Sequence, residues 1–145
     1  MMPSTIEQKR AEGSWIAVTQ RFGPQLDQHG ALAKRYLTAM RQTATRVHVS
    51  GLGQSIAFLR SRKDEGGRYA AEDLSSLALQ ALGRPLAQNA DASLQLIRLI
   101  QNEDLIFLVR ATEEIMGLIA WSSRYLQGAG IEVGDPEDEE DEGNV

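Results

Sequence analysis

The side chains with the clearest chemical potential in this sequence are the arginines and lysines between residues 21 and 68. Nine bases stand there against three acids, Asp27, Asp64 and Glu65, which leaves a net charge of +6. The bases are Arg21, Lys34, Arg35, Arg41, Arg46, Arg60, Arg62, Lys63 and Arg68. Arginine grips two phosphate oxygens with a planar fork, and lysine supplies a mobile point charge. The segment therefore predicts a surface that binds a polyanion through its phosphates.

Other side chains that could do chemistry are not spaced for catalysis. The sequence has no cysteine, which excludes disulfides, thiolate catalysis and cysteine-ligated metals. His29 and His48 belong to no H-x-x-x-H or H-x-x-E arrangement. Glu113 and Glu114 are adjacent, so on a helix they point about 100° apart, whereas a catalytic carboxylate pair must converge on one bond. Because no G-x-S-x-G motif or P-loop is present either, we expect no catalytic residue, no metal and no cofactor.

Acidic residues are concentrated at the C-terminus. Residues 131–145 carry eight acids and no base, so the formal net charge of −5 becomes fifteen bases against twelve acids, or +3, for residues 1–130. We expect residues 1–130 to form one helical domain and residues 131–145 a disordered acidic tail, because the tail has little apolar surface to bury. Three roles are open for it: a phosphate mimic that competes for the basic surface, a docking strip for a basic partner, or a solvated extension.

The elements that must position these residues are predicted to be helices. Apolar side chains recur at three- and four-residue steps, and no segment shows the alternation that a sheet needs. The prediction is an all-α, single-domain bundle of about six helices. The first begins at a Ser4-x-x-Glu7 capping box and ends at Gly23. The others are expected at Gly30–Val47, Leu52–Arg62, Tyr69–Leu82, Ala92–Gln101, and from a cap at Asn102 to Gly128.

Glycines mark two of the connections. Residues 64–67, with the sequence Asp-Glu-Gly-Gly, are predicted to form a flexible turn. Gly51 and Gly53 add little bulk to the start of the third helix, where Ser50 is the expected cap, so another backbone is expected to approach closely there.

The predicted helices place the basic residues on a shared surface. On a helical wheel of residues 30–47, the polar and basic side chains fall within an arc of about 140° opposite the apolar side. The next helix ends in a compact basic cluster at residues 60–63. Bases arranged in this way can follow a nucleic-acid backbone without reading its sequence. The predicted RNA contacts are Lys34, Arg35, Arg41, Arg46, Arg60, Arg62, Lys63 and Arg68.

The last helix carries two apolar stripes. One runs from Leu105 to Leu126 and is expected to form the spine of the core. The second, on the adjoining side, includes Phe107, Trp121 and Tyr125, which are predicted to contact neighbouring subunits.

A resemblance to a known family rests on the segment Gly-Leu-Gly-Gln-Ser-Ile-Ala-Phe-Leu at residues 51–59, followed by Arg-Ala-Thr-Glu-Glu at residues 110–114 and by Trp121 to Tyr125. In their order and spacing these motifs resemble the small helical subunit of the Type III-B CRISPR (Cmr) effector complex. The resemblance covers roughly Arg21 to Gly128, and the acidic tail has no counterpart in it. It implies a non-catalytic, all-α subunit that stacks as copies beside the backbone nuclease subunits and lines the guide–target RNA duplex.

The expected partners are therefore the CRISPR RNA and target RNA duplex, other Cmr subunits including the backbone nuclease subunit, and further copies of the same chain. No apolar run approaches the roughly 18 residues that a bilayer crossing needs, so no membrane partner is expected and the predicted location is cytoplasmic. Two rival classes stay open: a helical protein–protein adaptor without RNA contact, and a small hydrolytic or nucleotide-binding enzyme.

Overall fold

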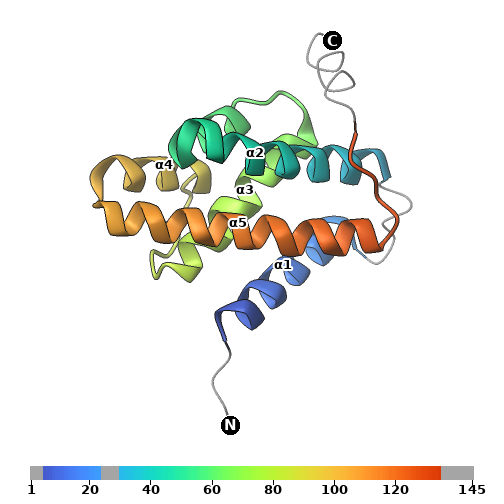
Figure 1. The fold of residues 1–145 in the computed structure, drawn as a ribbon, viewed down its shortest axis with the longest axis horizontal. Coiled ribbons are helices and arrows are strands. Elements are labelled where there is room, and N and C mark those ends of the chain that lie inside the picture. Colours follow the sequence, from blue (N-terminus) through green and yellow to red (C-terminus); the bar gives the residue numbers. More distant parts are fainter. Residues whose placement is uncertain (1–4, 24–29, 135–145) are drawn as a thin grey trace.

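Helices account for most of residues 5–23 and 30–134, which are the residues that the computed structural model describes. They are α1 (Ile6–Phe22), α2 (Gly30–Arg60), α3 (Glu65–Ala81), α4 (Ala92–Asn102) and α5 (Leu105–Gly128). Figure 1 shows α5 running alongside the first part of α2, with α1 on the opposite side of α5. No strand occurs in these two ranges, and the prediction of an all-α fold is confirmed.

Two predicted helices are joined in α2, which changes direction sharply at Gly51. The backbone of Gly51 has φ 81° and ψ 167°, outside the helical region. A positive φ strains residues with a Cβ atom, so glycine is suited to this point. Arg46 and Phe58 would lie about 18 Å apart along a straight helix. The Arg46 guanidinium instead lies 3.6 Å from the centre of the Phe58 ring, because the last part of α2 folds back beside the first.

Helix starts are set by the side chains that reach free backbone amides, and three of them differ from the prediction. At α1 the capping box is formed by Thr5 and Gln8, while Ser4 lies outside the described residues. The side chain of Asp64 accepts from the amide of Gly67, so residues 65–67 form the first turn of α3 rather than a flexible turn. Asp104 caps α5, and Asn102 is the last residue of α4. At each of these starts the capping side chain accepts from an amide of the first turn that has no partner within the helix.

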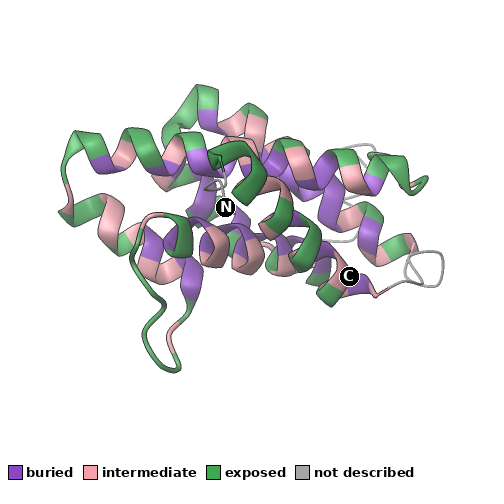
Figure 2. Ribbon diagram, turned by 90° about the horizontal axis from the view of Figure 1, so that it is seen from below, coloured by how far each residue is buried: buried purple, intermediate pink, exposed green. Residues whose placement is uncertain are grey.

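The core lies where α2, α3 and α5 meet. Its largest fully buried side chains include Tyr36, Leu37, Ile56, Leu74 and Ile115, drawn from all three helices. Figure 2 shows the buried residues facing inward between the helices and the exposed residues facing outward. Within the described residues, no helix combines the length and apolar character that crossing a membrane requires.

The close approach between backbones occurs at Gly66, and not at Gly51 and Gly53 as predicted. A Cβ atom on Gly66 would lie 2.8 Å from the amide nitrogen of Tyr36, and one on Gly67 would lie 2.5 Å from Nε of Arg62. At Gly53 the nearest atom would be 3.5 Å away, and at Gly51 nothing lies within 4 Å. The first turn of α3 therefore packs directly on the backbone of α2, which fixes the α2–α3 connection.

Candidate nucleic-acid interface

One face of α2 carries a row of polar and basic side chains, which we call the α2 strip. It consists of Lys34, Thr38, Arg41, Thr45 and His48, whose three- and four-residue spacing places them along one side of the helix. Four of them, from Thr38 to His48, line a shallow hollow of about 440 Å³. Val133 and Gly134 line the same hollow, so the end of the described chain lies on this face.

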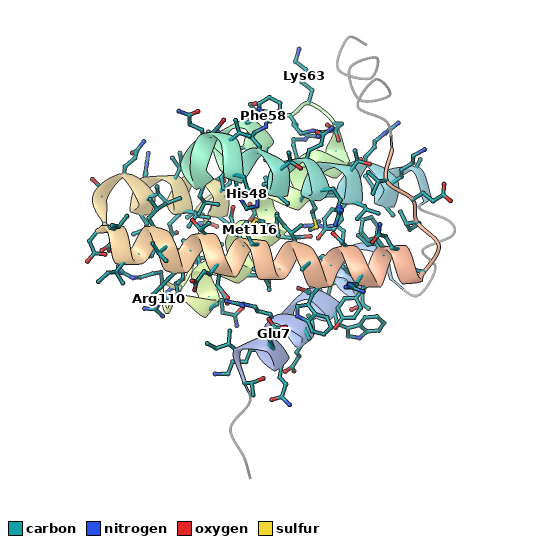
Figure 3. All side chains as sticks on the ribbon, viewed as in Figure 1. Glu7, His48, Phe58, Lys63, Arg110 and Met116 are labelled. Carbon is teal, nitrogen blue, oxygen red and sulfur yellow. The ribbon has the colours of Figure 1, made fainter. Side chains whose placement is uncertain are left out.

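A second row of α2, about 100° around the helix, faces the connection to α3. A Cβ atom on Gly66 would lie 2.7 Å from Cβ of Arg35. The side chain of Gln42 accepts a 3.3 Å hydrogen bond from Nη1 of Arg62, and Arg46 stacks on Phe58. The α2–α3 turn is therefore held against α2. Figure 3 shows Lys63 projecting from this side of the molecule.

Two of the predicted RNA contacts form ion pairs with carboxylates of the same chain. Nε of Arg62 lies 2.7 Å from Oδ1 of Asp64, and the Arg62 side chain is only 10% exposed. Because Asp64 is also the cap of α3, this arginine helps to fix the start of that helix. Nη2 of Arg60 lies 3.0 Å from Oδ2 of Asp91, but both of these side chains are 42% exposed.

The Asp91 carboxylate is held in its charged form. Partial burial opposes ionisation, but hydrogen bonds from Ser93, the backbone of Leu94 and Arg60 outweigh it and lower the pKa of Asp91 below its usual value. The Arg60–Asp91 pair is therefore intact at neutral pH, with an edge open to solvent.

Four of the predicted RNA contacts are exposed and form no ion pair with any other residue in the ranges 5–23 and 30–134. They are Lys34, Arg41, Lys63 and Arg68. Residues 30–63 contain no Asp or Glu, so Lys34 and Arg41 have no acid near them in the sequence, whereas Lys63 is followed by Asp64 and Glu65. The result is a band of positive charge over the α2 strip and the α2–α3 turn, which we call the basic surface. Arg35 and Arg46 lie beside this surface with part of each side chain accessible.

The residues predicted as subunit contacts form contacts within the chain. Phe107 is buried, Nε1 of Trp121 donates a 2.9 Å hydrogen bond to Glu7, and the Tyr125 hydroxyl donates a 3.0 Å hydrogen bond to the carbonyl of Ala11. Tyr125 also meets Trp15 edge to face, with ring centres 5.2 Å apart. Trp121 and Tyr125 therefore fasten α5 to α1.

Other apolar residues of α5 are exposed, which the two-stripe pattern of this helix did not predict. Leu105, Ile106 and Val109 are 72%, 68% and 48% exposed, although Leu105 was predicted to belong to the core stripe. A helical wheel shows that Ile106 and Val109 lie off both stripes, which is the signal available in the sequence.

A larger hollow, of about 990 Å³, lies between α1, α3 and α5, and two of its carboxylates, Glu114 and Asp73, are engaged by cations. Nε of Arg10 donates to both oxygens of Glu114, at 2.8 and 3.0 Å. Asp73 accepts from Nε of Arg21 at 3.2 Å and from the Tyr36 hydroxyl at 2.8 Å. Complete burial raises the pKa of Tyr36 well above its usual value, so the phenol stays a hydrogen-bond donor. In the described part of the chain, no group of His, Cys, Asp or Glu is placed to hold a metal ion.

The fold and this surface define a small all-helical protein whose longest helix presents unpaired cations to solvent. The family model described as "CRISPR-associated protein (Cas_Cmr5)" matches residues 6–129, and the chain belongs to this family. It is a small helical subunit of the Type III-B CRISPR (Cmr) complex, which acts in CRISPR defence.

A solved structure supports the same fold. The crystal structure of a CRISPR-associated Cmr5 family protein from Thermus thermophilus superposes with a TM-score of 0.64 at 22% sequence identity. The alignment covers 87% of this chain and 97% of that one. Comparison with curated proteins finds no match.

Proposed function

We propose that this protein is a non-catalytic, RNA-binding structural subunit that lines the guide–target RNA duplex of the Cmr complex. The observation that carries the proposal is the basic surface. It presents Lys34, Arg41, Lys63 and Arg68 to solvent, with no ion pair to another described residue. In this assignment other subunits cut RNA, and the complex works in the cytoplasm.

The chemistry of the surface suits a phosphate backbone rather than base edges. Double-stranded RNA has a deep, narrow major groove, so proteins recognise it through its phosphates, its 2′-hydroxyls and its shape. In RNA-guided complexes, base pairing with the guide supplies sequence selection. On the α2 strip Lys34 and Arg41 lie about 10 Å apart along the helix axis. Together with Lys63 and Arg68 they can contact separate phosphates without distinguishing sequences.

We rank the eight predicted contacts by their exposure and their ion pairs. The four exposed, unpaired cations are the primary candidates, and Arg35 and Arg46 flank them. Arg60 can turn its exposed edge toward RNA while it stays paired with Asp91. Arg62 contributes indirectly, because it holds the α2–α3 turn that positions Lys63.

Contacts with other Cmr subunits, including the backbone nuclease subunit and further copies of this chain, are assigned to exposed apolar residues. Leu105, Ile106 and Val109 at the start of α5 offer such a surface, whereas Trp121 and Tyr125 are engaged with α1. This patch also supports the alternative function, a helical adaptor without RNA contact.

The RNA proposal is tested by the salt dependence of target RNA capture in the assembled complex. A variant with Lys34→Ala, Arg41→Ala and Lys63→Ala loses three phosphate contacts, so the slope of log affinity against log salt falls by about two units. The matched control, Lys9→Ala with Arg98→Ala and Arg124→Ala, removes three exposed cations from α1, α4 and α5. Equal slopes for the two variants would contradict the proposal and favour the adaptor.

A further inference from the structure

The described chain ends against the α2 strip. After α5, the amide of Ile131 donates a 3.0 Å hydrogen bond to the carbonyl of Leu126, and the Ile131 side chain packs against the core. The amide of Gly134 then donates a 2.7 Å hydrogen bond to Oγ1 of Thr38. In Figure 1 this red segment crosses α2 and ends on the side from which Lys63 projects in Figure 3.

The contact at Gly134 is close and lies beside a cation. A Cβ atom there would lie 3.1 Å from Cε of Lys34 and 3.3 Å from Oγ1 of Thr38. Gly134 also lines the hollow that contains Arg41 and His48. The described chain is therefore anchored at one end of the α2 strip, with Gly134 next to Lys34.

The residues that follow are complementary in charge to this strip. Residues 135–145 lie outside the described part of the chain and contain seven acids and no base. The strip offers Lys34 and Arg41 without an ion pair to another described residue, and residues 30–63 contain no acid that would repel the segment. We propose that the acidic tail, residues 135–145, binds along the α2 strip and must be displaced by RNA.

The length of the tail is sufficient for this contact. Eleven extended residues span about 36 Å, whereas the strip from Lys34 to His48 is about 21 Å long. Because Gly134 tethers the tail at the strip, its effective concentration there is high without any further contact. Each carboxylate replaces a phosphate oxygen as the acceptor, and the attraction weakens as salt screens it. The family match ends at residue 129, so this segment lies beyond the matched region.

Binding of the tail is tested first without RNA, on the full-length chain. In a neutralised variant, Asn or Gln replaces the seven acids of residues 135–145. NMR spectra of the two proteins should differ in the backbone amides of residues 34–48 and of the α2–α3 turn, and the difference should fade at high salt. Identical α2 amides in the two proteins, or changes confined to other helices, would overturn the proposal and leave the tail for another partner.

Displacement by RNA rests on the proposed function and is tested with duplex RNA in a double-mutant cycle. Neutralising the tail should raise RNA affinity about fivefold at low salt in the wild-type background. It should raise affinity much less when Lys34 and Arg41 are alanine, whereas a general effect of net charge would persist there. An equal gain in both backgrounds would overturn competition for the strip. If no variant bound RNA, the proposed function would fail, while the NMR comparison would still decide whether the tail binds.

Discussion

At the scale of single residues, what a cation touches in the folded chain decides whether it can meet a phosphate. Arg41 and Arg62 were equivalent candidates in the sequence. In the structure, Arg41 is exposed, while Arg62 is largely buried between Asp64 and Gln42. The pairing of Arg62 with a carboxylate two residues away depends on the exact path of the α2–α3 turn, which periodicity does not define.

This difference predicts that the two arginines contribute unequally to the stability of the fold. Arg62→Ala leaves the Asp64 carboxylate largely buried without its partner, so the free energy of unfolding should fall by about 2 kcal/mol or more. Arg41→Ala, at an exposed position, should change it by less than about 0.5 kcal/mol. Urea denaturation of the two variants measures both quantities. If Arg62→Ala lowered the free energy of unfolding as little as Arg41→Ala does, Arg62 would have no structural role.

At the scale of elements, the α2–α3 connection determines where the basic surface lies. The turn at Gly51 folds the end of α2 back on its start, and the packing of Gly66 on Tyr36 seats α3. Together they bring residues 60–68 beside the first part of α2. The basic surface therefore depends on two glycine positions that carry no charge.

Alanine substitution of Gly66 and of Gly53 separates a packing requirement from helix propensity. Gly66→Ala would place a Cβ atom 2.8 Å from a backbone nitrogen, and we expect a loss of about 2 kcal/mol in the free energy of unfolding. Gly53→Ala is the matched control, because its Cβ atom would find an ordinary 3.5 Å contact and alanine favours the helix by about 1 kcal/mol. Thermal unfolding should rank Gly53→Ala above wild type and Gly66→Ala below it; the reverse order would refute the packing.

Much of the helical layout could be predicted from apolar periodicity, because an amphipathic helix repeats its buried side over many residues. The starts of the helices could not be predicted in this way, because neighbouring side chains compete to cap the same backbone amides. Asp104, and not Asn102, caps α5. The sequence also identified the stripe of Trp121 and Tyr125, but not its partner, which is α1 of the same chain. Leu105 shows the same limit, since periodicity assigns a face and only the fold shows what covers it.

At the scale of the whole molecule, the basic surface lies apart from the exposed apolar residues at the start of α5. Figure 3 shows Lys63 and Phe58 on the α2 side, and Arg110 and Glu7 on the side of α1 and α5. The exposed apolar residues at the start of α5 lie at another end of the fold from the anchored residues 131–134. This arrangement is consistent with the proposal that RNA binds at one surface and other subunits bind at another. The net charge of −5 conceals it, because the acids are concentrated in the last fifteen residues.

The most direct test of the account is crosslinking of RNA in the assembled Cmr complex. A photoreactive amino acid is placed at residue 41 or 63 on the basic surface, and at exposed residues 98 or 124 as controls on α4 and α5. The account predicts crosslinks to guide or target RNA from residues 41 and 63, and none from residues 98 and 124. The account would be contradicted by RNA crosslinks only from the control positions. It would also be contradicted if residues 41 and 63 crosslinked to protein alone in the RNA-containing complex.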